Sequence, residues 1–136
     1  MKSNRNRNEV LIVGSTGSLG QPIVSELIRR GVPVRLMGRS LESFIDAGYL
    51  HAVKNGGFSP NINANIVVCN DVTRLAAYKD EWFQDVSCVI CVARPRSLRD
   101  GDDSMYYQTI VSLCNAVKSN NVPRMLLHGI LSSSLL

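Results

Sequence analysis

Long apolar runs, zinc-binding spacings and concentrated positive charge are all missing from this chain of 136 residues. No apolar stretch approaches the roughly 18 residues that a membrane-spanning helix needs, which argues against a membrane protein. Segment 1–8 is polar and is not followed by the apolar core of a secretory signal, so it predicts a disordered leader before a single domain over 9–136. The net charge of +4 comes from scattered residues, a distribution that does not favour a nucleic-acid partner.

The cysteines give little support for redox or metal chemistry. Cys88 and Cys91 have the spacing of redox and metal-binding pairs. They lie in the apolar run 86–92, which predicts a buried strand, and residues three apart in a strand point to opposite faces. We therefore interpret them, with Cys69 and Cys114, as reduced structural thiols of a cytoplasmic protein.

The sequence does contain a regular alternation of strand-like and helix-like segments. Apolar runs predict strands at 9–13, 33–37, 65–69, 86–92 and 124–128, and amphipathic segments predict helices at 19–30, 41–45 and 102–119. Such alternation is typical of α/β proteins with a doubly wound parallel sheet. The expected strand order is 3-2-1-4-5, with a ligand site at the carboxyl ends of strands one and four.

The remaining segments are less regular. Segment 48–63, which contains Gly56-Gly57 and Ser59-Pro60, is expected to be a loop. A helical face is expected from the spacing of Leu75, Tyr78 and Trp82. Three aspartates around the start of the last helix are interpreted as charges that favour its N-terminus rather than as metal ligands: Asp100, Asp102 and Asp103.

A glycine-rich segment joins the first predicted strand to the first predicted helix. Gly14 allows a sharp turn, Gly17 lets a phosphate approach the backbone, and Gly20 lets the helix pack closely on the sheet. The context predicts a dinucleotide pyrophosphate site at the helix N-terminus, with a plain structural turn as the alternative. The expected cofactor-binding residues of this loop are Gly14, Ser15, Thr16, Gly17, Ser18, Leu19 and Gly20.

The end of the second predicted strand bears on the choice between NAD and NADP. NAD-binding proteins usually place an acidic residue there, but this chain has Met37-Gly38-Arg39-Ser40. Arg39 and Ser40 are therefore expected to bind the 2′-phosphate of NADP, with Arg35 as a second candidate. NADP is favoured and NAD remains possible, and a solvated surface arginine is the alternative role for Arg39.

These motifs together resemble the atypical short-chain dehydrogenases/reductases, of the NmrA-like and isoflavone-reductase-like kind. The resemblance covers roughly residues 9–131 and is carried by segments 10–20, 34–39, 70–71, 107–108 and 121–127. It implies a Rossmann domain of the oxidoreductase class. It also implies that Asp71 and Val72 flank the adenine ring and that Ala93 lines the path to the nicotinamide ribose. A helix N-cap before Leu75 is an equally good interpretation of Asp71.

The chain departs from that family in its catalytic residues and its length. No tyrosine is followed four residues later by the lysine that would lower its pKa. His128-Gly129-Ile130 stands where the family has a serine pair, and Ser132, Ser133 and Ser134 come slightly later. A structural role for His128 is favoured over that of a base. Because the sequence stops after the fifth strand, we expect the substrate-binding region to be absent. We assign no catalytic residue and expect little dehydrogenase turnover.

Three functions stay open at this point. The first is the NAD(P)-binding domain of an oxidoreductase, and the second is a non-enzymatic dinucleotide-sensing regulator or assembly factor of the NmrA-like kind. The third is a degenerate fragment that folds poorly. The strand at 124–128 is expected near an open sheet edge beside the apolar tail 131–136, which favours self-association or a protein partner that covers the edge.

Overall fold

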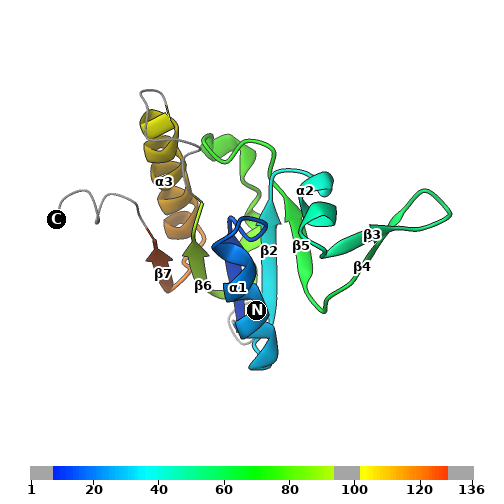
Figure 1. Ribbon diagram of the computed structural model, residues 1–136. Helices are drawn as coiled ribbons and strands as arrows, with labels where there is room; N and C mark the ends of the chain where they lie inside the picture. The colour runs from blue at the N-terminus through cyan, green and yellow to red at the C-terminus, as the bar shows by residue number, and fades with distance from the viewer. Residues whose placement is uncertain (1–7, 94–101, 129–136) are drawn as a thin grey trace.

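The computed structural model describes residues 8–93 and 102–128, and the side chains of the second range from Tyr106 onward (Figure 1). Of the predicted leader it describes only Asn8, whose N–H donates to the Asp85 carbonyl over 3.0 Å. The predicted apolar tail and the serines at 132–134 lie outside the described residues, as do Asp100 and the side chains of Asp102 and Asp103.

Five parallel strands form the central sheet. Its order is β5 (Asn65–Val68), β2 (Val34–Gly38), β1 (Glu9–Val13), β6 (Val86–Cys91) and β7 (Arg124–Leu127). This is the predicted 3-2-1-4-5 order, and the doubly wound α/β fold is confirmed. The chain leaves β1 towards one edge of the sheet and later returns to fill the other, so the winding reverses beside β1.

Apolar side chains on both faces of the sheet form two cores. Leu11 and Val13 pack in one core with the helix α3 (Asp102–Ser119), while Ile12 packs in the other with α1 (Gly20–Arg29) and α2 (Leu41–Asp46). Figure 1 shows α1 and α3 over different parts of the sheet. A parallel sheet covered on both faces needs the continuous apolar strands seen in the sequence.

Segment 48–63 is a β-hairpin, so the expectation of an irregular loop is wrong. The antiparallel strands β3 (Leu50–Ala52) and β4 (Phe58–Pro60) extend away from the main sheet (Figure 1). Gly56, with φ of +83°, adopts the left-handed conformation near the turn. Strands of three residues are too short to show the alternation by which a hairpin is recognised.

The helical face expected at 75–82 is also wrong. Two short 3₁₀ turns, η1 (Leu75–Ala77) and η2 (Asp80–Phe83), are separated by extended backbone at Tyr78 and Lys79. The break follows from tertiary contacts, because the Tyr78 ring is buried and its hydroxyl donates to the Val72 carbonyl over 2.7 Å. Leu75 stays exposed instead of sharing a buried face.

Cys88 and Cys91 face opposite sides of β6. Cys91 belongs to the core that contains α3, whereas Cys88 pairs with Val10, which packs against the other core. Both thiols are free, and burial raises the pKa of Cys91 to about 11. Across residues 8–93 and 102–128, no helix is long and apolar enough to cross a membrane.

Candidate functional site

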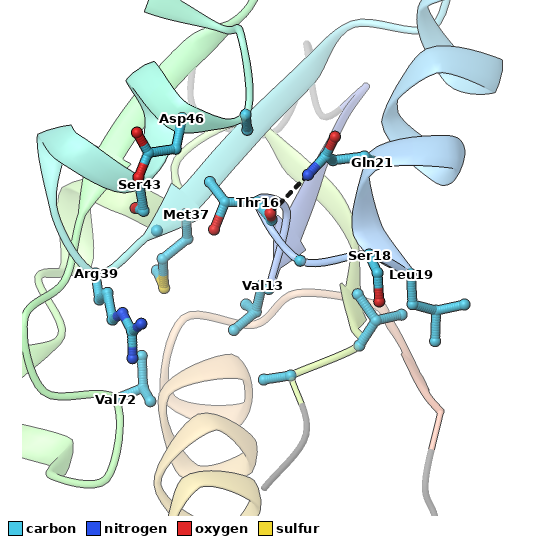
Figure 2. A pocket seen from close by; sticks show the side chains of 16 residues that line it. Val13, Thr16, Ser18, Leu19, Gln21, Met37, Arg39, Ser43, Asp46 and Val72 are labelled. Carbon is cyan, nitrogen blue, oxygen red and sulfur yellow. Dashed lines mark hydrogen bonds between the residues drawn. The ribbon is translucent and has the colours of Figure 1, made fainter. Parts of the chain in front are cut away.

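A cleft of about 520 Å³ opens at the carboxyl ends of β1, β2 and β6, where the winding of the sheet reverses. Its walls come from the glycine loop, the end of β2, one side of α2, and the segments after β5 and β6 (Figure 2). The lining residues are Val13, Gly14, Thr16, Gly17, Ser18, Leu19, Gln21, Met37, Gly38, Arg39, Ser43, Asp46, Ala47, Val72, Val92 and Ala93.

Two of the three loop glycines are required by the backbone itself. Gly14 has φ of +89°, and a Cβ there would lie 2.7 Å from the backbone nitrogen of Ala93. A Cβ on Gly20 would collide with the Gly14 carbonyl oxygen. A Cβ on Gly17 would meet only that oxygen, at an ordinary 3.5 Å. The protein therefore leaves room at Gly17, on the side that faces the cleft.

Internal hydrogen bonds hold the loop in a tight turn. The Gly17 N–H donates to the Gly14 carbonyl over 3.2 Å. The side-chain amide of Gln21 donates to the Thr16 carbonyl over 2.8 Å (Figure 2). Helix α1 begins at Gly20, and no side chain caps it. Within residues 8–93 and 102–128, the N–H groups of Ser18 and Leu19 have no protein acceptor. These amides lie at a helix N-terminus, where an anion is favoured.

The side chain of Ser15 points beneath the loop, and Ser15 does not line the cleft. Its side chain is fully buried, and its hydroxyl donates to the Met37 carbonyl over 3.1 Å. Its own carbonyl accepts a hydrogen bond of 2.9 Å from the Tyr49 hydroxyl. Tyr49 was missed in the sequence because its partner is remote in the chain and no motif connects them.

Arg39 and α2 form the wall beyond β2. Arg39 is exposed, and Figure 2 shows its side chain extending past Met37 towards Val72. Ser40 does not line the cleft; its hydroxyl accepts from the Ser43 N–H over 3.2 Å and caps α2. Asp46, which sequence reasoning missed, lines the cleft with Ser43, and their spacing on one helix face is the signal that could have found them.

Arg35, the second candidate for phosphate binding, lies elsewhere, and that expectation is wrong. Its Nε is 3.0 Å from Oε1 of Glu9, and both side chains are largely buried. Its Nη1 donates over 2.9 Å to the carbonyls of Trp82 and Gln84. The side chain ties β2 to β1 and to the end of η2, and it is absent from the cleft wall.

Of the residues assigned by resemblance, Val72 and Ala93 line the cleft and Asp71 does not. Asp71 accepts hydrogen bonds from the side chain and backbone of Thr73, and these hold the pKa of its carboxyl below the usual value. The alternative of a helix N-cap is wrong, because Arg74 is the residue that precedes η1. Asp71 instead shapes the turn that carries Val72.

His128 lies at the end of β7 and is not part of the cleft wall. Its N–H donates to the Cys91 carbonyl over 3.0 Å, and its carbonyl accepts from the Tyr106 hydroxyl over 3.3 Å. Both bonds use its backbone, and they connect β7 to β6 and to α3.

Three solved structures that contain a similar fold each have a dinucleotide bound. The yeast methylglyoxal/isovaleraldehyde reductase Gre2, complexed with NADPH, is 22% identical with a TM-score of 0.65, over 88% of this chain and 37% of that one. Gre2 of Candida albicans, also with NADPH, is 16% identical with a TM-score of 0.68, over 88% and 36% of the two chains. WbmH of Bordetella bronchiseptica, in complex with NAD⁺, is 19% identical with a TM-score of 0.61, over 87% and 37%.

The chain has a Rossmann fold. It spans little more than a third of the length of these Rossmann proteins. No protein-family profile and no curated protein sequence matches it. At these identities the likeness establishes the fold, and the function has to be argued from the cleft itself.

Proposed function

We propose that the chain binds a dinucleotide, NAD(P), in the cleft and forms the cofactor-binding portion of an atypical short-chain dehydrogenase/reductase-like oxidoreductase. The observation that carries the proposal is the loop at the N-terminus of α1. The loop residues Gly17, Ser18 and Leu19 line a cleft whose wall also includes Arg39 and Ala93. An anion is favoured at such a helix N-terminus.

The dimensions and chemistry of the cleft suit such a ligand. The pyrophosphate would lie against the amides of Ser18 and Leu19, where the helix dipole favours negative charge. The adenosine half would extend towards Arg39 and Val72, and the nicotinamide half towards Ala93. A volume of about 520 Å³ is within the range of cofactor sites.

A preference for NADP is the finer part of the proposal. Arg39 is exposed in the cleft wall and, in the described part of the chain, has no carboxylate partner. A guanidinium that is free to bind can hold a 2′-phosphate with two parallel hydrogen bonds. Asp46 in the same wall opposes this preference, because its carboxylate repels a phosphate dianion.

The chain's own residues would bind and orient the cofactor, which supplies the hydride chemistry when bound. A non-enzymatic dinucleotide-sensing regulator or assembly factor of the NmrA-like kind is the second candidate. Both candidates require the same binding event.

Calorimetric titration of the purified chain with NADPH, NADH and ATP tests the proposal. We expect both dinucleotides to bind, NADPH more tightly, and ATP to bind more weakly because it has no nicotinamide half. Circular dichroism of the same sample establishes that the protein is folded. Binding of neither dinucleotide by a folded chain would contradict the proposal.

A further inference from the structure

Ser15 is held from two sides by buried hydrogen bonds that the glycine motif does not explain. The Tyr49 hydroxyl donates to the Ser15 carbonyl over 2.9 Å, and the Ser15 hydroxyl donates to the Met37 carbonyl over 3.1 Å. Tyr49 is 6% exposed and Ser15 is 0% exposed. Burial raises the pKa of Tyr49, so its hydroxyl remains protonated and continues to donate.

The Tyr49 bond fixes the orientation of one peptide unit of the loop. In a planar trans peptide the C=O and the following N–H point in opposite directions. Because the Ser15 carbonyl points inward to Tyr49, the N–H of Thr16 points the other way, and Thr16 lines the cleft. Rotation of this peptide would leave a buried hydroxyl without an acceptor and would turn a carbonyl oxygen outward.

Tyr49 is itself fixed by its surroundings. Its N–H donates to the Phe44 carbonyl at the end of α2 over 2.9 Å, and its carbonyl accepts from the Asn61 N–H over 2.8 Å. The Asn61 side chain also donates to the Gly48 carbonyl over 3.0 Å. The hairpin therefore sets the height of the Tyr49 hydroxyl below the loop.

We propose that Tyr49 is a positioning residue for the anion-binding loop: its hydroxyl holds the Ser15–Thr16 peptide with the N–H towards the cleft, and this sets the affinity for a ligand's pyrophosphate. The inference rests on the proposed dinucleotide binding. It assigns to a hairpin outside the glycine motif a direct influence on the strength of the phosphate site.

Tyr49→Phe removes the hydroxyl and keeps the ring in the core. We expect affinity for NADPH to fall on the order of three- to tenfold, the usual effect of one lost hydrogen bond. Affinity for adenosine 2′-monophosphate, which has no pyrophosphate and would bind through Arg39, should change less than twofold. The matched control is Tyr107→Phe, which removes a hydroxyl from an exposed ring and should leave both affinities unchanged.

A second readout is independent of the ligand. The amide NMR signal of Thr16 in the free protein should shift in Tyr49→Phe, and in Ser15→Ala as a second variant. Equal losses for the two ligands would indicate general destabilisation and overturn the inference. So would unchanged NADPH affinity in a folded variant. If the parent binds no dinucleotide, the proposed function fails. Unchanged Thr16 signals in the variants would then also overturn the proposed role of Tyr49 in orienting the Ser15–Thr16 peptide.

Discussion

At the scale of single residues, the three loop glycines lack a side chain for different reasons. Neighbouring backbone leaves no space for a side chain at Gly14 or Gly20. A Cβ on Gly17 would meet only the Gly14 carbonyl oxygen at an ordinary distance, and Gly17 lines the cleft. A substitution at Gly17 therefore separates loss of the ligand from loss of the fold.

Gly17→Val should abolish dinucleotide binding while the midpoint of thermal unfolding stays close to that of the parent, because the added methyl groups occupy the phosphate position. Gly20→Val is the contrasting variant and should lose about 1–3 kcal/mol of stability, because its Cβ meets the Gly14 carbonyl. Calorimetry and thermal denaturation measure the two effects. A Gly17→Val protein that binds like the parent would show that the loop is only a turn.

Arg39→Ala should weaken NADPH roughly tenfold or more and NADH much less, because a charge-assisted bond to the 2′-phosphate contributes on the order of 1.5–3 kcal/mol. Arg124→Ala is the control. It removes an exposed arginine at the start of β7, away from the cleft, and should change neither affinity. Equal losses for both cofactors in Arg39→Ala would mean that Arg39 does not distinguish them.

The cysteines should react with iodoacetamide in the order of their exposure. Cys114 is exposed and should be alkylated first at pH 8, while Cys91 is buried and its pKa is raised to about 11, so at this pH it is a protonated thiol. Its reactivity should rise as the pH approaches 11. Mass spectrometry of the native protein measures the order, and rapid joint modification of Cys88 and Cys91 would instead reveal a reactive dithiol.

At the scale of elements, the apolar sheet strands and the long helices were predictable, whereas the hairpin and the 3₁₀ turns were not. Helices α1 and α3 extend over 10 and 18 residues, and each sheet strand lies in an apolar run, so their patterns could be recognised in the sequence. The hairpin and the 3₁₀ turns are three or four residues per element, and remote contacts such as the Tyr78–Val72 bond fix them. Secondary-structure propensities reflect neighbouring residues in the sequence and cannot predict such contacts.

The same distinction holds in the candidate site. The backbone of the glycine loop follows from the motif, since glycines at fixed spacing have a steric purpose. The side-chain roles of Ser15 and Arg35 do not follow from any motif, because their partners are far along the chain. Ser15 donates to the Met37 carbonyl, and Arg35 donates to the Trp82 carbonyl. Ser40 is a case where a cap competes with a ligand for the same hydroxyl, and in the structure the cap is formed.

Ser40→Ala should lower the free energy of unfolding by about 1 kcal/mol, because α2 loses its N-cap. Since Ser43 and Asp46 line the cleft from this helix, NADPH affinity should fall as well. Ser25→Ala, in the exposed face of α1, is the matched control and should not destabilise the protein. Urea denaturation measures the difference; a Ser40→Ala protein as stable as the parent would rule out a contribution of the cap.

At the scale of the whole molecule, β7 presents an apolar edge that pairs with no further strand among the described residues. It is the last strand of the sheet on its side, and Leu126 and Leu127 are 59% and 49% exposed. Strand edges of this kind are templates for pairing with another chain.

We expect the chain to self-associate through β7, with a sedimentation coefficient that rises with concentration. Leu126→Lys should shift the protein towards the monomer, because a charge on the edge opposes pairing. Val68→Lys on β5, the strand at the opposite edge, is the control and should leave association unchanged. A parent protein that stays monomeric at all concentrations would contradict this expectation.

The position of β1 at the centre of the sheet also determines the order of assembly. One of its partners, β2, follows directly in the chain, whereas the other, β6, comes only after β5 and both 3₁₀ turns. During synthesis β1, β2 and β5 therefore emerge from the ribosome before β6, and until β6 follows, one side of β1 has no partner strand. Parallel pairing over so long a loop is slow. The backbones of Gly14, after β1, and Ala93, after β6, lie close together, and both residues line the cleft. The cleft therefore acquires its shape only when β6 pairs with β1.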